Sequence, residues 1–170
     1  VIKELERAGI INDFNVFGER ISFEFKNFTI KKLLNDFGVW LELFVYKSAL
    51  DSGKFDDVDM SVVIDWNHRL NERDDVLNEI DVIVTKGTTP VFISCKAGNV
   101  SAAAINEIKT LTDRFGGSLA KGVLITCEEL SEYSVKTYRR ATELGIRVIE
   151  LSDLYRENPA SILERIVLNG

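Results

Sequence analysis

Two apolar segments decide the predicted fold: Glu79–Thr85, with the sequence EIDVIVT, and Pro90–Lys96, with the sequence PVFISCK. Both have the length and the β-branched composition typical of strands, and residues 86–89 between them have the composition of a turn. Each segment nevertheless carries charge, because Asp81 lies within the first and Lys96 ends the second. An unpaired charge in a half-buried strand is costly, so these two residues need partners. They are the first candidates for a functional site.

Segments on either side extend this pair of strands into an α/β domain. Three antiparallel strands in a meander are followed by strand–helix–strand units, which favour parallel pairing through right-handed crossovers. We therefore expect a mixed central sheet of about five strands flanked by helices. The further strands are predicted at Val58–Trp66, Gly122–Cys127 and Arg147–Leu151, and the helices at Thr29–Leu50, Ser101–Phe115, Ser131–Leu144 with Ser131 as N-cap, and from Asn158 onward with Pro159 in the first turn.

Residues 1–28 follow a different pattern from the rest of the chain. Val1–Ala8 predicts a short helix ended by Gly9, and Ile21–Phe25 alternates as a strand. This arrangement favours the tail of a preceding winged-helix-like region, or a linker, with a domain boundary near Asn27 and the main domain over residues 29–170. Because the chain begins without an initiator Met, we expect a fragment of a longer protein.

The composition excludes several classes of protein. The chain is 45% hydrophobic and 28% charged with a net charge of −6, as expected of a globular domain. Residues 51–83 carry 3 basic and 10 acidic side chains and account for the imbalance. An acidic chain has no bulk attraction to nucleic acid, so binding needs a local basic lining. No apolar run reaches the ~18 residues of a membrane span. Cys95 and Cys127, both in strand-like runs, favour a reducing, cytoplasmic setting.

Strand alternation predicts how the charged side chains are arranged. A period of two places Glu79 and Asp81 on one face of their strand, and Ser94 and Lys96 together on the next. The opposite face of the first strand is then expected to hold Ile80, Val82 and Val84. A carboxylate and a lysine brought together at neighbouring strand ends favour a bound divalent cation, which would polarise a phosphate while the lysine orients or deprotonates a water.

A third acid is expected from the long helix. With Ile30 at the centre of its apolar face, Glu42 falls about 120° away, at the border of that face. Gly38, one turn earlier, leaves room for close approach to the sheet. Glu42 is therefore predicted to reach the sheet edge where Asp81 lies.

This order of a helix Glu, a strand Asp and a Lys on the next strand resembles the core of PD-(D/E)XK nucleases. The segments GVWLE (Gly38–Glu42), NEIDV (Asn78–Val82) and ISCKAG (Ile93–Gly98) resemble one branch in particular. That branch is the nuclease domain of CRISPR accessory endonucleases activated by cyclic oligoadenylate, in which a CARF sensor domain precedes the nuclease. The resemblance spans roughly Thr29–Leu151. It implies a restriction-endonuclease-like fold, Mg or Mn as cofactor, cleavage of DNA or RNA, a homodimer, and an upstream sensor domain outside this chain.

The resemblance also implies roles for individual residues. Glu42 would be the helix acid, Asp81 the principal metal ligand and Lys96 the catalytic lysine. The second acid of the motif would fall at position 94, where this chain has Ser94, and a neutral hydroxyl is a weaker ligand for a hard cation. Glu79 is one candidate to replace that acid. Glu107, at the flank of the next helix, is a more distant one.

Two other functions stay open at this stage. If no acid replaces Ser94, the domain is a catalytically lapsed nuclease fold that serves as a binding or assembly module. Alternatively, the enzyme acts on a small nucleotide or another phosphoester. The remaining motifs argue for less: the one histidine, His68, lies in a polar loop, the cysteines lack zinc-site spacing, and the basic residues Lys136, Arg139 and Arg140 share one helix.

Overall fold

The computed structural model describes residues 2–65 and 77–169, except for the side chains of residues 32–35, 65 and 77. Trp66, His68 and the polar connection around them lie outside the described residues. The chain divides into two compact units, Val1–Trp40 and Leu41–Gly170.

The first unit consists of short helices and a hairpin. Helix α1 (Ile2–Arg7) precedes the antiparallel strands β1 (Ile11–Phe17) and β2 (Arg20–Phe25), and helix α2 (Phe28–Asn35) follows. The helix ended by Gly9 and the second strand agree with the sequence pattern, whereas β1 was not predicted. The winged-helix-like identity of this region and the boundary near Asn27 remain predictions.

The long helix predicted at Thr29–Leu50 is wrong in one respect, because it is interrupted. Helix α2 ends at Asn35, and α3 (Phe37–Ser52) begins after Asp36, whose carboxylate accepts the Gly38 N–H at 3.1 Å. A short side chain that caps a helix competes with continuation of the preceding helix. The helical phase therefore does not carry from Ile30 to Glu42. The buried face of α3 consists of Leu41, Val45 and Ala49, while Phe37 and Phe44 are 75% and 46% exposed.

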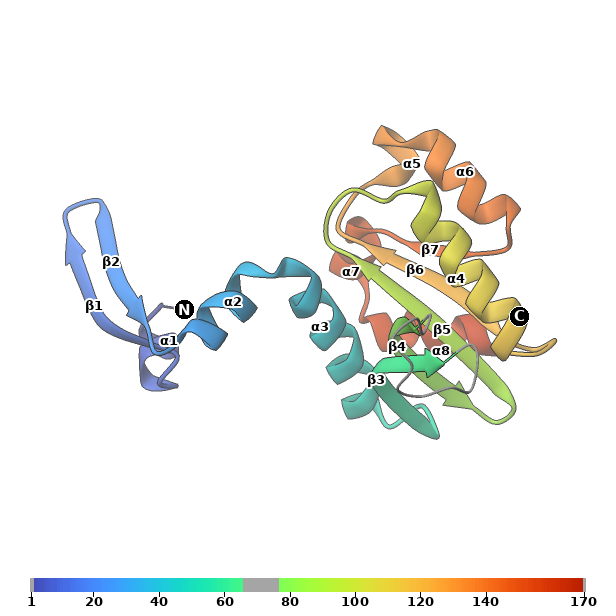
Figure 1. Cartoon of the computed structure of the whole chain (residues 1–170), viewed down its shortest axis with the longest axis horizontal. Helices are drawn as coiled ribbons and strands as arrows, with labels where there is room; N and C mark the ends of the chain where they lie inside the picture. Colours follow the sequence, from blue (N-terminus) through green and yellow to red (C-terminus); the bar gives the residue numbers. More distant parts are fainter. Residues whose placement is uncertain (1, 66–76, 170) are drawn as a thin grey trace. The chain divides into compact units, whose positions relative to one another are not determined.

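The second unit contains the predicted mixed sheet of five strands (Figure 1). Its strands follow the order β3-β4-β5-β6-β7, with the first three antiparallel and the last two parallel to β5. The strands are β3 (Asp57–Asp65), β4 (Leu77–Lys86), β5 (Thr89–Lys96), β6 (Lys121–Thr126) and β7 (Arg147–Ile149); the helices are α4 (Ala102–Phe115), α5 (Leu130–Tyr133), α6 (Val135–Glu143), α7 (Leu151–Arg156) and α8 (Pro159–Leu168).

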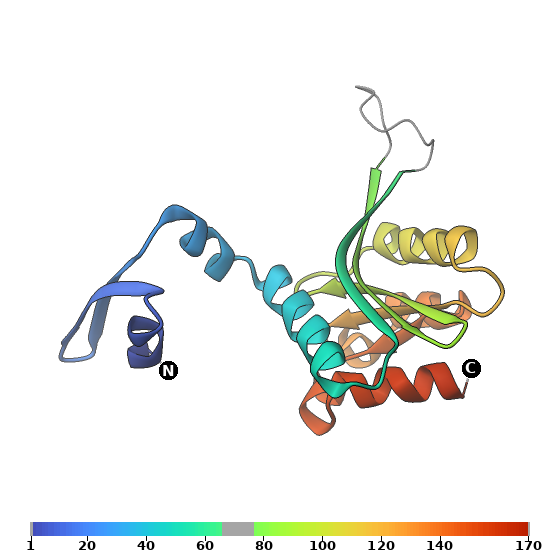
Figure 2. The same cartoon turned by 90° about the horizontal axis from the view of Figure 1, so that it is seen from below.

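Helices cover both faces of this sheet. Helices α3 and α8 pack on one face, and α4 and α6 on the other; Figure 2 shows α4 and α8 on opposite sides of the strands. The core on the α3/α8 face includes Val82, Val84, Val91, Ile93, Cys95, Val123 and Ile125, and the core on the α4/α6 face includes Ile80, Phe92, Ile105, Ile108, Leu111 and Leu124. Along β5 and β6 the side chains alternate between the two cores, as the period of a strand requires.

Two elements near the C-terminus differ from their predictions, and the buried Glu150 contributes to both differences. The helix predicted at Ser131–Leu144 is two helices, α5 and α6, and Ser131 is not its N-cap. Instead, the N–H and hydroxyl of Ser131 both donate to the Glu150 carboxylate at 2.6 Å. Glu150 also caps α7, so the strand predicted to reach Leu151 stops at Ile149. The predicted cap of the last helix is confirmed, because the Asn158 side chain accepts the Ala160 N–H.

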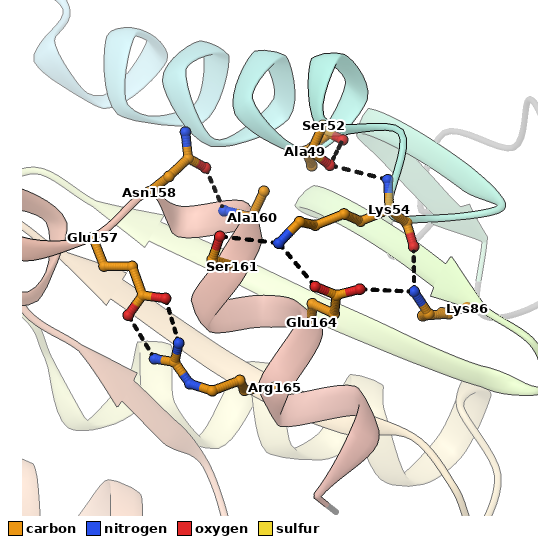
Figure 3. Close-up of polar contacts among 10 residues, drawn as sticks. All are labelled: Ala49, Ser52, Lys54, Lys86, Glu157, Asn158, Ala160, Ser161, Glu164 and Arg165. Carbon is orange, nitrogen blue, oxygen red and sulfur yellow. Dashed lines mark hydrogen bonds and ion pairs between the residues drawn. The ribbon is translucent and has the colours of Figure 1, made fainter.

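Helix α8 is held against the sheet by a shared ion pair, drawn in Figure 3. The Glu164 carboxylate pairs with the ammonium groups of Lys54 at 2.8 Å and Lys86 at 3.0 Å. Lys54 also donates to the Ser161 hydroxyl, and Lys86 to the Lys54 carbonyl oxygen. The hydrogen bonds that Lys54 and Lys86 donate to the Glu164 carboxylate lower its pKa. The contacts join α8 to the turn after α3 and to the end of β4.

Candidate active site

The candidate site lies where β4 and β5 separate, which we call the fork. Their ladder runs from Lys86–Thr89 to Val82–Ile93 and stops there. Continuing the same register would bring the Cys95 N–H against the backbone of Ile80. Instead, that N–H donates to Asp81 Oδ2 at 2.6 Å, so a side chain replaces the next rung of the ladder. The separation leaves a small pocket between the two strands and α4.

Asp81 is held firmly by one of its two carboxylate oxygens. Besides the Cys95 N–H, Oδ2 accepts the Lys96 ammonium at 3.2 Å and the Ser94 hydroxyl at 3.3 Å. The Asp81 side chain is 15% exposed and that of Lys96 36% exposed. Among the described residues, Oδ1 accepts no hydrogen bond. Asp81 is therefore anchored through Oδ2, while Oδ1 has free coordination capacity.

Three further predicted site residues line the same pocket as Asp81 and Lys96. They are Glu79, Ser94 and Glu107. Glu107, on α4, accepts a hydrogen bond from the Asn78 amide at 2.7 Å. Sequence analysis assigned no role to Asn78, although this residue begins the segment NEIDV. The pocket has a free volume of about 30 Å³, enough for one small cation or one or two water molecules.

Glu42, the sixth predicted site residue, is not among the residues that line this pocket. It is half-buried on α3. Its negative charge nevertheless acts on β5, because it contributes to the raised pKa of Cys95. Glu42 is therefore close enough to influence the site electrostatically from the α3 face of the sheet.

The Cys95 thiol reports the environment at this point of the sheet. Burial is the main cause that raises its pKa well above the usual value of 9.0, and the charges of Asp81 and Glu42 raise it further. Lys96 opposes them. The thiol consequently stays protonated, which disfavours its use as a nucleophile or a metal ligand.

The predicted alternation along β4 is wrong at Asp81. Val82 packs in the core on the α3/α8 face, but Ile80 packs in the core on the α4/α6 face. Residues two apart in a regular strand share a face, so the strand turns over between them. Opposite Asp81, Ser61 of β3 has a left-handed backbone with φ of 52°. Glu79 therefore does not simply share the face of Asp81, although both line the pocket.

The donors at this pocket fit a hard divalent cation. Mg²⁺ is commonly bound through one or two carboxylates, with water and substrate phosphate completing its coordination. Asp81 Oδ1 offers one such ligand, and Glu79 and Glu107 are further carboxylates along the same pocket. Over residues 2–65 and 77–169, no three or more His, Cys, Asp or Glu side chains come together as a group that could hold a metal ion. A cation held here through Asp81 would need water and substrate for most of its coordination.

The family of the chain follows from comparison with known proteins. The model of the Card1-like endonuclease domain matches residues 29–163. The chain belongs to this family. The Card1-like match covers both strands of the fork, α3 with Glu42, and α4 with Glu107. A comparison with curated proteins finds no match.

Solved structures show the same fold as this Card1-like domain. VC1899 from Vibrio cholerae shares 22% identity and a TM-score of 0.71, over 98% of this chain and 41% of that protein. Can2 from Sulfobacillus thermosulfidooxidans, solved in complex with cyclic tetra-adenylate, shares 20% identity and a TM-score of 0.60, over 99% of this chain and 44% of that protein. The chain thus spans less than half the length of each of these two proteins. Within the described part of the chain, no helix combines the length and hydropathy needed to cross a membrane.

Proposed function

We propose that this domain is a divalent-metal-dependent endonuclease that hydrolyses phosphodiester bonds in DNA or RNA, with Mg or Mn as cofactor. The observation that supports this most is the Asp81–Lys96 pair at the fork, 3.2 Å apart, in a chain of the Card1-like endonuclease family. Metal-assisted cleavage of a phosphodiester can use an anchored carboxylate and a cationic donor that face one pocket, and these two residues supply both.

In this proposal the residues of the fork divide the work. Asp81 binds the cation through Oδ1, Glu79 or Glu107 supplies a second carboxylate, and Glu42, which does not line the pocket, contributes through water. When bound, a divalent cation polarises the scissile phosphate and lowers the pKa of a water molecule. Lys96 orients the attacking water and stabilises the negative charge that develops on the phosphate. The Cys95 N–H keeps the Asp81 side chain in one orientation throughout, because its 2.6 Å bond anchors Oδ2.

Ser94 sets the expected strength of the cation site. Its hydroxyl donates to Asp81 at 3.3 Å, in the place where the family motif has an acid. Fewer negative charges at the pocket mean weaker binding of a hard cation. Glu79 or Glu107 supplies the second carboxylate in our proposal, and we expect Mn²⁺ to support activity at lower concentration than Mg²⁺ because it binds N/O sites more readily and tolerates less regular coordination.

We propose that the whole protein is a CRISPR-associated defence protein and that this domain is its effector. The proposal rests on the family match and on similarity to the longer Can2, which was solved with a cyclic oligonucleotide. The activating ligand would bind to a sensor domain outside these residues, and the protein would act in the cytoplasm as a homodimer. Light scattering of the purified protein tests the dimer.

The decisive experiment is cleavage of plasmid DNA, single-stranded DNA and RNA with Mn²⁺ or Mg²⁺. We compare the wild type with Asp81→Asn and Lys96→Met, using Asp59→Asn and Lys109→Met as matched controls. Asp59 lies exposed on the neighbouring strand, and Lys109 pairs with Asp113 on α4. Metal-dependent cleavage that both site variants abolish and both controls retain supports the nuclease.

A second candidate is the catalytically lapsed binding module. It is favoured by Ser94 in the acid position and by the lack of a three-ligand group within the described ranges. Calorimetry with Mn²⁺ separates the two functions. Absence of both cleavage and Mn²⁺ binding supports the lapsed module, whereas Mn²⁺ binding without cleavage indicates a different phosphoester substrate or a requirement for the activating domain.

A further inference from the structure

Ser61 occupies an unusual backbone conformation directly beside the candidate site. It lies in the middle of β3, yet its φ of 52° is in the left-handed region that residues with a Cβ rarely adopt. In the β3–β4 ladder, Met60 pairs with Val82 and Val62 with Ile80. The position between those pairs, where Ser61 faces Asp81, is missing from the ladder.

At this position both strands exchange the faces of the sheet to which their side chains point. On β3, Val58 and Met60 pack against the core on the α3/α8 face, whereas Ile64 packs against the core on the α4/α6 face. On β4, Val82 and Ile80 divide between the same two cores. An uninterrupted strand keeps residues an even number apart on one face. The reversal on both strands therefore starts at the Ser61–Asp81 pair.

The turnover is not an ordinary bulge. In β1, Asp13 also has a φ of 52°, and there the register of the hairpin shifts by one residue. At Ser61 the register is the same before and after, so no extra residue has been inserted. The left-handed residue changes the direction of the strand pair without changing its register.

The fork between β4 and β5 also begins at Asp81. On the other side of Asp81, the β4–β5 ladder stops at Val82–Ile93, and Figure 2 shows the start of β4 running with β3 away from the rest of the sheet. At Asp81, therefore, β4 loses its regular pairing both with β3 and with β5. This departure brings its carboxylate to the Cys95 N–H, which a continuous ladder would have used for a backbone bond.

We propose that Ser61 is a positioning residue for Asp81. Its left-handed backbone turns the β3–β4 hairpin over, opens the fork from β5 and thereby sets the Asp81 carboxylate against Cys95. The role belongs to the backbone, because the Ser61 side chain is exposed and makes no hydrogen bond among the described residues. In its catalytic consequence the inference rests on the proposed nuclease function, but its structural core does not.

The test compares substitutions that tolerate or oppose a positive φ. Ser61→Gly accepts the left-handed conformation freely, whereas the β-branched side chain of Ser61→Val strongly disfavours it. Asp59→Val introduces the same side chain two residues away, at an exposed position of β3, and serves as the control. The first readout is the backbone amide resonance of Cys95 and its hydrogen-exchange protection, with Asp81→Ala as the reference for a lost bond.

We expect Ser61→Gly and Asp59→Val to keep the Cys95 amide at its wild-type position. In Ser61→Val the amide shifts towards its position in Asp81→Ala and loses protection. Cleavage gives the second readout: kcat falls at least about tenfold in Ser61→Val with KM nearly unchanged, since misplacing a reacting group by about 1 Å costs up to about 100-fold. Ser61→Gly keeps kcat within about twofold of the wild-type value, because only the backbone conformation matters.

Two results would overturn the inference: a folded Ser61→Val with an unchanged Cys95 amide, or a Ser61→Gly as damaging as Ser61→Val. If Ser61→Val does not fold, the polar but β-branched Ser61→Thr gives the milder opposition to a positive φ, and the same amide resonance decides. Should the wild type itself fail to cleave any substrate, the nuclease proposal fails while the Cys95 amide still tests the role of Ser61.

Discussion

The ion pair between Asp81 and Lys96 makes a quantitative prediction for a double-mutant cycle. At 3.2 Å and an effective dielectric constant of about 20, the attraction between the two charges is about 5 kcal/mol before any cost of desolvation. Lys96 is more than a third exposed, so solvent screens the pair and the ordering of its long side chain offsets part of the gain. We expect a coupling free energy of about 1–2 kcal/mol between Asp81→Asn and Lys96→Met, measured by urea unfolding in the presence of a chelator.

The same variants test cation binding through stability. At a free Mn²⁺ concentration 100 times its dissociation constant, binding to the folded state stabilises the wild type by about 2.7 kcal/mol. For a chain of this size that corresponds to a rise in melting temperature of about 5–11 °C. Asp81→Asn should show no such rise, because the substitution removes the negative charge that the cation needs. A coupling energy below about 0.3 kcal/mol, or an Asp81→Asn variant that Mn²⁺ stabilises as strongly as the wild type, would refute the reasoning.

Three further perturbations have expected outcomes. Ser94→Glu places a second carboxylate beside Asp81, so it should lower stability in chelator but tighten Mn²⁺ binding about tenfold or more, as calorimetry measures. Because Lys54 and Lys86 lower the pKa of Glu164 from its usual 4.5, the ionised carboxylate stabilises the fold above that pH and loses this effect as pH falls through the lowered pKa. Glu164→Gln should therefore melt a few °C lower than the wild type near pH 7, by circular dichroism, and this difference should shrink as the pH falls through the lowered pKa of Glu164. Mass spectrometry after alkylation should show modification of the partly exposed Cys127 under native conditions, slowed because burial raises its pKa, and modification of the buried Cys95 only under denaturing conditions.

The order of the strands was predictable because their signals are local. The strands β4 and β5 show apolar runs of the right length with a turn between them, and the apolar run Gly122–Cys127 predicts a buried parallel strand, which is β6. The break between α2 and α3 was less accessible. Asp36 has the same chemistry in a helix interior as at a cap, and only the chain direction after it decides which role it takes.

Asp81 and Lys96 could be found from the sequence because a charge inside or at the end of an apolar strand stands out wherever it occurs. Glu107 and Asn78 were harder to rank, since they lie 29 positions apart and their hydrogen bond exists only once α4 covers the sheet. The assignment of faces failed at Ile80, because alternation assumes a regular strand and Ser61 interrupts it from the neighbouring strand.

The sequence by itself determined the five strands of the central sheet and their order along the chain, the charged residues in them and the resemblance that implied a nuclease, because these depend on local periodicity and residue type. Only the tertiary structure decided where β4 parts from β5, which oxygen of Asp81 is anchored and which remains free, and that Ser61 faces Asp81. Those features depend on contacts of Asp81 with Ser61, 20 positions earlier, and with Cys95, 14 positions later, and no local pattern encodes such distances. The sequence thus identifies the charged side chains of the site, and long-range backbone geometry brings them together.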